Sequence, residues 1–258
     1  MLGAIVGDIV GSPYEYNNIK RKDFELFTDR CFITDDSVLT LAVCHALCQR
    51  SSDLHKTAQQ SIMDFAWRYA GKDYGDSFRR WMQLPNPTPY NSFGNGAAMR
   101  VSPCSLAAKS IDEAKAMSYA VTSVTHNHPE GLKGAKATAI AGFLAKTGQS
   151  KQAIEKYIND HYYPMDFSLE EIRPDYQYEV SCQGTVPVAL KAFFESASFE
   201  DALRNAVSIG GDSDTIAAIT GGVAGFYYGI EEWITQKSLN YLDDYLRQIL
   251  LTFEKQFA

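Results

Sequence analysis

Two short acidic motifs, far apart in the chain, each open a largely apolar segment. Residues 34–37 read Thr-Asp-Asp-Ser and lead into residues 38–43, which carry no charge. Residues 210–215 read Gly-Gly-Asp-Ser-Asp-Thr and lead into residues 216–225, which are small or branched. Uncharged segments of this kind predict buried helices. Because a carboxylate in the first turn suits the helix dipole and caps free N–H groups, either motif alone is also consistent with an ordinary helix cap.

The two motifs have the same parts, namely a threonine and two aspartates ahead of a buried helix. Anions crowded at the entrance of a buried helix repel each other and resist desolvation unless a cation lies between them. If the motifs face one another, their four carboxylates and two hydroxyls form the all-oxygen set that hard divalent cations prefer. The pattern therefore favours a site for two ions, Mg2+ or Mn2+, with these candidate ligands: Thr34, Asp35, Asp36, Asp212, Asp214 and Thr215.

Helical periodicity dominates the rest of the chain, and no set of alternating strands is convincing. Gly3, Gly7 and Gly11 recur every four residues, so they share one helix face against which a neighbouring backbone can pack closely. The 258 residues, 45% of them hydrophobic, suffice for one large core, and no linker or repeat divides them. We therefore predict an all-α fold, a compact many-helix bundle that forms a single domain over residues 1–258.

Several segment boundaries follow from the same patterns. Residues 17–31 are polar, and residues 161–179 are rich in tyrosine and proline, so we expect irregular structure in both, the second on the surface or at the rim of a site. Apolar spacing predicts helices at residues 187–196 and 239–257.

Charge and cysteine content exclude several classes of protein. A formal net charge of -7 argues against a nucleic-acid backbone as the main partner, although a small anionic ligand can still be held locally. No run approaches the roughly 18 apolar residues that a membrane span needs. The five cysteines form no Cys-x-x-Cys pair, and the first residues make a poor signal peptide. We expect a cytoplasmic protein with no membrane partner.

Four further side chains or loops are candidates for chemistry. Glu15 follows the first helix, although a lone glutamate is usually a solvated surface charge. We interpret Asp8 as a buried, hydrogen-bonded carboxylate. The loop at residues 94–96 (Gly-Asn-Gly) presents N–H groups at a helix start, which suits an anion or a diphosphate, but the same tripeptide also forms ordinary turns. His126 fits either a substrate contact or a core residue that caps a helix.

Other catalytic patterns are missing. The chain has no Gly-x-Ser-x-Gly elbow, no motif around a cysteine, and no lysine of the kind a Walker loop requires. His126 and His128 are two residues apart and do not share a helix face, so a helical zinc site is not indicated.

Taken together, the motifs resemble the ADP-ribosylglycohydrolase family, which includes the dinitrogenase reductase-activating glycohydrolases and the ADP-ribosylhydrolases. The resemblance runs nearly end to end, through Gly-Asp-x-x-Gly-x-x-x-Glu at residues 7–15, the acidic motif at 34–37, Gly-Asn-Gly-Ala-Ala-Met-Arg at 94–100, His-x-x-Pro at 126–129 and the acidic motif at 210–215. It implies an all-α orthogonal bundle with a dinuclear Mg2+ or Mn2+ centre at the bottom of a cleft.

The resemblance also implies the reaction and the residues that carry it. The substrate would be an ADP-ribosylated protein or a small ADP-ribose conjugate, and the bond cleaved would be the glycosidic bond at ribose C1″. Arginine is the first linkage we expect, with serine or O-acetyl-ADP-ribose the second, and we expect a monomer. The catalytic residues would be Glu15 and Asp36, and the substrate-binding residues Ser92, Phe93, Gly94, Asn95, Gly96 and His126.

Two rival classes remain open from the sequence. A binding or crystallin-like protein of the same family would hold ADP-ribose without turnover. A metal-dependent phosphoesterase would use the same cations but release phosphate or AMP, whereas a glycohydrolase releases intact ADP-ribose.

Overall fold

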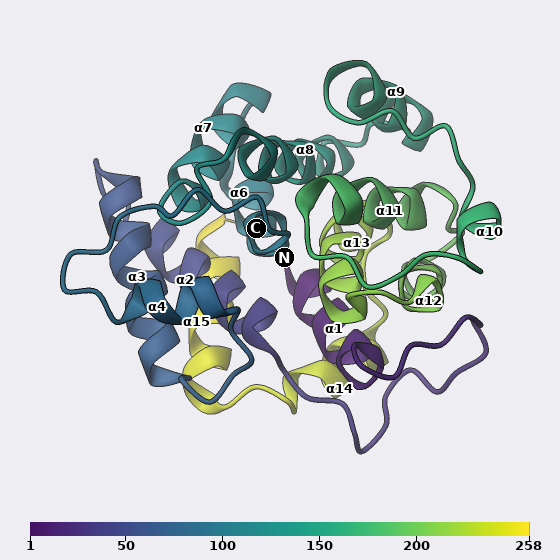
Figure 1. Ribbon diagram of the computed structural model, residues 1–258, viewed down its shortest axis with the longest axis horizontal. Coiled ribbons are helices and arrows are strands. Elements are labelled where there is room, and N and C mark those ends of the chain that lie inside the picture. The colour runs from purple at the N-terminus through teal and green to yellow at the C-terminus, as the bar shows by residue number, and fades with distance from the viewer. Residues whose placement is uncertain (258) are drawn as a thin grey trace.

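The computed structural model describes residues 1–257, and helices joined by loops make up this range (Figure 1). Within it, strand-like pairing is confined to an isolated bridge between Gly94 and Ser181. The helices in chain order are α1 (Leu2–Gly11), the 3-10 turn η1 (Ser12–Tyr14), α2 (Asp35–Cys48), α3 (Leu54–Arg68), α4 (Asp76–Met82), α5 (Gly96–Met99), α6 (Ser102–Ala107), α7 (Ile111–Thr122), α8 (Pro129–Lys146), α9 (Lys151–His161), α10 (Leu169–Ile172), α11 (Cys182–Phe194), α12 (Phe199–Ile209), α13 (Ser213–Tyr228), α14 (Glu232–Leu239) and α15 (Asp244–Phe257). The predicted all-α bundle is confirmed.

Helices α1 and α13 form the centre of the bundle, with α2, α3 and α15 to one side and α11 and α12 to the other (Figure 1). Every residue of α1 is buried. A Cβ added to Gly3 would lie 2.1 Å from the carbonyl oxygen of Gly221, and one added to Gly7 would lie 2.0 Å from that of Ala217. Since no side chain fits at such distances, the glycine stripe is what lets the two backbones touch. The predicted close packing along this face is therefore confirmed.

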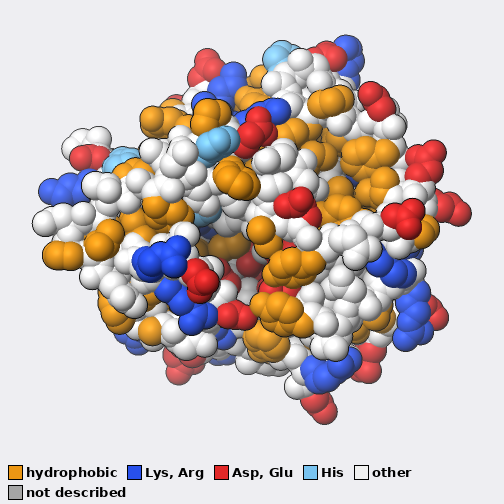
Figure 2. Space-filling model, viewed as in Figure 1, with side chains coloured by type: hydrophobic (Ala, Val, Ile, Leu, Met, Phe, Trp, Pro, Cys, Tyr) orange, Lys and Arg blue, Asp and Glu red, His pale blue; other side chains and the backbone are white. Residues whose placement is uncertain are grey.

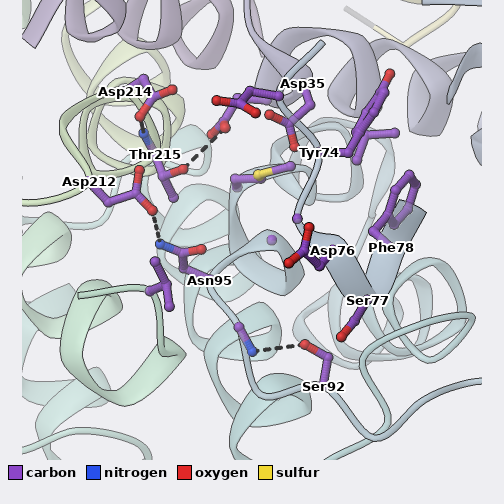
Figure 3. Close-up of a pocket in the computed structure, with 18 of the residues that line it drawn as sticks. Asp35, Tyr74, Asp76, Ser77, Phe78, Ser92, Asn95, Asp212, Asp214 and Thr215 are labelled. Carbon is purple, nitrogen blue, oxygen red and sulfur yellow. Dashed lines mark hydrogen bonds between the residues drawn. The ribbon is translucent and has the colours of Figure 1, made fainter. Parts of the chain in front are cut away.

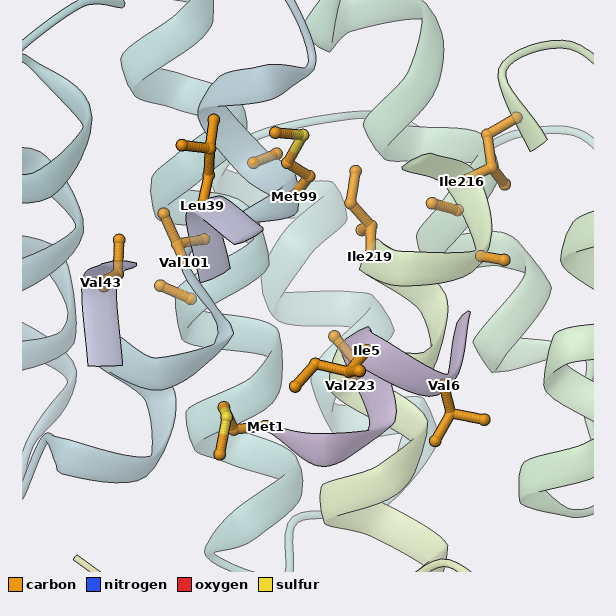
Figure 4. Close-up of a cluster of buried hydrophobic side chains, with 14 of the residues drawn as sticks. Met1, Ile5, Val6, Leu39, Val43, Met99, Val101, Ile216, Ile219 and Val223 are labelled. Atoms are coloured by element: carbon orange, nitrogen blue, oxygen red, sulfur yellow. The ribbon is translucent and has the colours of Figure 1, made fainter. Parts of the chain in front are cut away.

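Apolar side chains of α1, α2 and α13 meet in one core. Figure 4 shows Ile5 of α1 beside Val223 of α13, with Leu39 of α2 close to Met99 at the end of α5. These four side chains are at most 4% exposed. Because α1 packs on both α2 and α13, the core constrains where the N-terminal ends of those two helices can lie.

Two predicted helix boundaries are wrong. Helix α11 begins at Cys182 and not at residue 187, because the Ser181 hydroxyl accepts a hydrogen bond from the N–H of Gly184 and caps the helix, which then continues through Pro187. The helix predicted at residues 239–257 begins later, at Asp244, and α14 (Glu232–Leu239) before it was not predicted. Asp243 caps α15 by accepting from the N–H of Leu246 at 2.8 Å.

The segments at residues 17–31 and 161–179 are mostly irregular, as predicted, apart from the end of α9 and the short α10 in the second. Among the described helices, none has the length and apolar character needed to cross a membrane.

Candidate active site

A cavity of about 560 Å³ opens where the N-terminal ends of α2 and α13 meet. Figure 2 shows it as a hollow with acidic atoms at its edge and floor. Its lining includes seven carboxylates: Glu15, Asp35, Asp36, Asp73, Asp76, Asp212 and Asp214. Aromatic side chains and the glycine loop complete the wall, so the cavity joins an acidic floor to a surface that suits a larger organic ligand.

Asp8 of α1 holds the first acidic motif in place. Its carboxylate accepts hydrogen bonds from the N–H and hydroxyl of Thr34, at 3.0 and 2.7 Å, and from the N–H and hydroxyl of Ser37. The Thr34 hydroxyl in turn accepts from the N–H of Asp36 and caps α2. The interpretation of Asp8 as a buried, hydrogen-bonded carboxylate is confirmed, and it sets the backbone from which Asp35 and Asp36 project.

The second acidic motif follows two glycines in the left-handed region, Gly210 with φ 74° and Gly211 with φ 73°. Asn18 ties this turn to the loop after α1: its Nδ2 donates to the carbonyls of Tyr14 and Gly211, at 2.7 and 2.9 Å, and its Oδ1 accepts from the N–H of Gly211 at 2.7 Å. These bonds keep the loop that carries Glu15 next to the start of α13. Sequence analysis missed Asn18, since a single asparagine in a polar loop gives no signal.

The two acidic motifs face one another, which is the condition for the two-ion site that the sequence pattern favours. The hydroxyl of Thr215 donates to Asp36 Oδ2 at 3.1 Å, a contact between residues 179 positions apart (Figure 3). Oxygens of Glu15, Asp212 and Asp214 lie within 4.8 Å of one another. Glu15 therefore lies against the acidic cluster itself, and is not a solvated surface charge.

Burial and mutual repulsion raise the pKa of the clustered carboxyls. Burial and then the charge of Asp8 raise the pKa of Asp35 to about 8. The pKa values of Asp36 and Asp214 also lie well above the ordinary range, first through burial and then through neighbouring carboxylates. In addition, Asp36 Oδ1 is buried and has no hydrogen-bond partner among the described residues. A cation between these groups would relieve both penalties, so the residues present fit a divalent metal site.

The glycine loop forms another part of the cavity lining and is hydrogen-bonded to the acidic cluster. Asn95 Nδ2 donates to Asp212 Oδ2 at 2.7 Å. The N–H of Gly94 donates to Ser92 Oγ at 3.1 Å, and that of Asn95 to the carbonyl of Val180 at 2.7 Å. Two of the loop N–H groups that we expected to be free for an anion are thus already engaged within the protein.

Most of the predicted site residues line the cavity, but two do not. The predicted residues that line it are Glu15, Asp35, Asp36, Ser92, Gly94, Asn95, Gly96, His126, Asp212, Asp214 and Thr215. Thr34 is 4% exposed and uses its hydroxyl for Asp8. Phe93 is 48% exposed and packs edge-on against His128. The roles assigned to all these residues stay predictions.

Two tyrosines at the mouth of the cavity were not singled out in the sequence. Tyr178 donates to Glu15 Oε1 at 3.1 Å, and Tyr16 donates to Asp73 Oδ2 at 2.9 Å. Their rings stack with centroids 6.3 Å apart. Tyr178 belongs to the tyrosine-rich segment 161–179 that we expected on the surface or at a site rim, so composition gave a partial signal for it.

The fold and this acidic cavity define an all-helical protein with a candidate metal site, and comparison with known proteins gives the family. The family model described as ADP-ribosylglycohydrolase matches residues 1–257. The chain therefore belongs to the ADP-ribosylglycohydrolase family, whose members are hydrolases acting on ADP-ribosyl glycosidic bonds.

Individual relatives are distant but cover most of the chain. ADP-ribosylhydrolase ARH3 of Mus musculus is 25% identical over 90% of this chain and 83% of its own length. ADP-ribosyl-[dinitrogen reductase] glycohydrolase of Rhodospirillum rubrum is 26% identical over 84% and 77%. ADP-ribosylarginine hydrolase Tri1 of Pseudomonas putida is 24% identical over 91% and 72%. A solved structure titled ADP-ribosylglycohydrolase-related protein complex matches the fold with a TM-score of 0.74, at 24% identity, over 100% of this chain and 96% of that one.

Proposed function

We propose that this enzyme removes ADP-ribose from modified arginine side chains by hydrolysing the glycosidic bond at ribose C1″, with two Mg2+ or Mn2+ ions. The observation that carries the proposal is the contact between Asp36 and Thr215, which joins the two acidic motifs at one end of a cavity large enough for a nucleotide-sized ligand. The choice of arginine is supported by the relative from Pseudomonas putida, which is named as an ADP-ribosylarginine hydrolase. We further propose that the enzyme acts as a monomer in the cytoplasm.

The metal ligands in this proposal come from both acidic motifs. Asp35, Asp36, Asp212, Asp214 and Thr215 would hold the ions, because their oxygens gather at the cavity and the unpartnered Asp36 Oδ1 needs a positive neighbour. Thr34 is the weakest member of the predicted set, since it is not among the residues that line the cavity, and its hydroxyl both donates to Asp8 and accepts from the N–H of Asp36. When bound, divalent cations would orient the ribose hydroxyls and lower the pKa of a water molecule.

Glu15 takes the direct catalytic role in this proposal. It borders the cluster, is half-buried, and is oriented by the hydroxyl of Tyr178. A carboxylate held in this way accepts a proton from the attacking water or assists the departing guanidino group while positive charge develops at C1″. The wall formed by Ser92, residues 94–96 and His126 would bind the diphosphate, and Asp36 would serve the metals.

Product analysis by mass spectrometry tests the proposal. Purified protein is incubated with mono-ADP-ribosylated arginine peptides and, in parallel, serine peptides, each with Mg2+ and with EDTA. Intact ADP-ribose released from the arginine peptide only in the presence of metal is the expected result. Release from the serine peptide alone would reassign the linkage, and release of AMP or phosphate would overturn the glycohydrolase chemistry. Binding of ADP-ribose without any turnover would indicate a catalytically silent protein.

A further inference from the structure

The imidazole of His126 is held from behind by two donors. Its Nδ1 lies 3.1 Å from Nη2 of Arg100 and 2.8 Å from Oγ1 of Thr125. A guanidinium group carries only donors, so Arg100 donates this bond and Nδ1 accepts it. A neutral imidazole whose Nδ1 accepts must carry its proton on Nε2.

The opposite nitrogen faces the glycine loop. A Cβ added to Gly96 would lie 3.3 Å from Nε2 of His126, and one added to Gly94 would lie 3.6 Å away. These three residues line the cavity together. The N–H groups of Gly94 and Asn95 are already bonded to Ser92 and Val180, so the N–H at Nε2 of His126 is a donor that this wall still presents to a ligand.

Arg100 is an unusual residue for this position. It is 0% exposed, and its Nε and Nη1 have no hydrogen-bond partner among the described residues. Its Nη2 contacts Thr125 and His126, and no carboxylate in the described chain forms an ion pair with it. Burying an unpaired cation is costly, so packing alone does not explain the choice of arginine.

We propose that Arg100 is a positioning residue that holds His126 as the neutral imidazole with its proton on Nε2, aimed at a phosphate oxygen of the bound ADP-ribose. The inference rests on the proposed function, which places the diphosphate at this wall. The guanidinium charge also opposes a second proton on the ring: burial, and then the charge of Arg100, lower the pKa of His126 well below its usual value. The donor at Nε2 is therefore present in one form across the neutral pH range.

The surroundings of the ring support a single protonation state. In the described part of the chain, the charged group that faces the His126 imidazole is the guanidinium of Arg100. The titratable group beside it is the phenol of Tyr90, whose ring centroid lies 6.0 Å from that of the imidazole. Burial raises the pKa of Tyr90 to about 12, so this phenol stays neutral. Gly94 and Gly96, which lie next to Nε2 of the ring, do not titrate.

Nitrogen NMR of the imidazole tests the inference without any change at Arg100. In the wild-type enzyme, labelled at histidine and assigned by difference from His126→Ala, Nδ1 of His126 should resonate as an unprotonated nitrogen and Nε2 as a protonated one, with no titration between about pH 6 and 8. A proton on Nδ1, or an imidazolium in this range, would overturn the inference.

Binding of ADP-ribose in the presence of Mg2+, measured by calorimetry, tests the functional consequence. Arg100→Met should weaken binding about twofold or more above neutral pH, because the tautomer with its proton on Nδ1 becomes populated and the apparent affinity falls in proportion to the fraction of molecules that keep the donor at Nε2. It should also introduce a dependence on pH between about 6 and 8 that the wild type lacks. In the His126→Ala background the same change should have little further effect, and Arg100→Lys should restore part of the affinity. Thr125→Val is the matched control, since it removes the other hydrogen-bond donor to Nδ1 of His126 and leaves the guanidinium of Arg100 in place.

The outcomes separate this inference from the proposed function. A folded Arg100→Met enzyme that binds ADP-ribose as tightly as the wild type would overturn the positioning role. So would a loss of affinity on Arg100→Met that is as large in the His126→Ala background as in the wild type. Neither result would affect the hydrolysis of the arginine peptide. If Arg100→Met does not fold, the NMR of the wild type decides. Failure of peptide hydrolysis, with the Arg100 and His126 results as expected, would instead count against the proposed reaction.

Discussion

The side-chain amide of Asn95 donates a 2.7 Å hydrogen bond to Asp212 Oδ2, across 117 positions of sequence. One end of this bond belongs to the glycine loop and the other to the acidic cluster. The loop that would bind the diphosphate and the carboxylates that would bind metal are thus coupled by a single contact.

Asn95→Ala is expected to impair both functions. A hydrogen bond to a charged group contributes about 1.5–3 kcal/mol, so kcat/KM should fall roughly 10- to 100-fold, with weaker Mg2+ binding because Asp212 loses its orientation. Steady-state kinetics and metal titration check this, with the exposed Asn240→Ala as control. Unchanged turnover and metal affinity would show that the contact is not needed.

Glu15→Gln and Asp36→Asn should separate proton transfer from metal binding. Glu15→Gln removes the group that exchanges a proton with water or the leaving group, so turnover should fall by about 100-fold or more while metal content is retained. Asp36→Asn removes a proposed ligand, so metal content should fall together with activity. Turnover and metal analysis of both purified variants give the answer. An active Glu15→Gln enzyme would remove the catalytic assignment. If the Glu15→Gln enzyme instead loses its metal, Glu15 is a metal ligand, which its position beside Asp212 and Asp214 permits.

Without metal, the folded enzyme should lose stability as the pH rises. In the folded state the pKa of Asp35 is raised to about 8, and the pKa values of Asp36 and Asp214 are also raised. At any pH between the ordinary carboxyl pKa and these raised pKa values, the native state therefore binds more protons than the unfolded state. Stability contributed by these groups is therefore complete below about pH 4 and is lost as the pH rises toward 8.

Thermal unfolding in EDTA from pH 5 to 8 measures this effect, compared with the same series in Mg2+. The metal should remove most of the decline, because it binds the deprotonated carboxylates and its affinity increases with pH. A metal-free enzyme whose Tm does not fall relative to the Mg2+ series would contradict the raised pKa values.

Gly7→Ala should disrupt the central helix pair. The added Cβ would lie 2.0 Å from the carbonyl oxygen of Ala217, a backbone atom that cannot rotate away. We expect a loss of at least about 3 kcal/mol in the free energy of unfolding, at or beyond the upper range for overpacking. Urea denaturation checks this, with Gly71→Ala as control, because a Cβ at Gly71 meets nothing within 4 Å. Equal stability of the two variants would mean that α1 and α13 can separate at little cost.

Several features could be predicted from the sequence because they depend on neighbouring residues. Apolar spacing indicated most of the helices, and the repeat of Gly3, Gly7 and Gly11 indicated a close backbone contact. The two wrong helix boundaries arose where a capping side chain, and not the apolar spacing, determined the start of the helix. Ser181 starts α11 ahead of Pro187, and Asp243 starts α15 at Asp244 and not at residue 239.

The sequence by itself thus determined the all-helical fold, the glycine face of α1 and the two acidic motifs as a pair of like parts, because residue type and short spacing express these properties directly. The tertiary structure decided that Thr215 reaches Asp36, that Asn95 reaches Asp212, that Glu15 borders the cluster and that a buried Arg100 lies behind His126. These contacts join residues from 26 positions apart, as for Arg100 and His126, to 179 positions apart, as for Asp36 and Thr215. No local pattern encodes the distance between segments that only tertiary packing brings together.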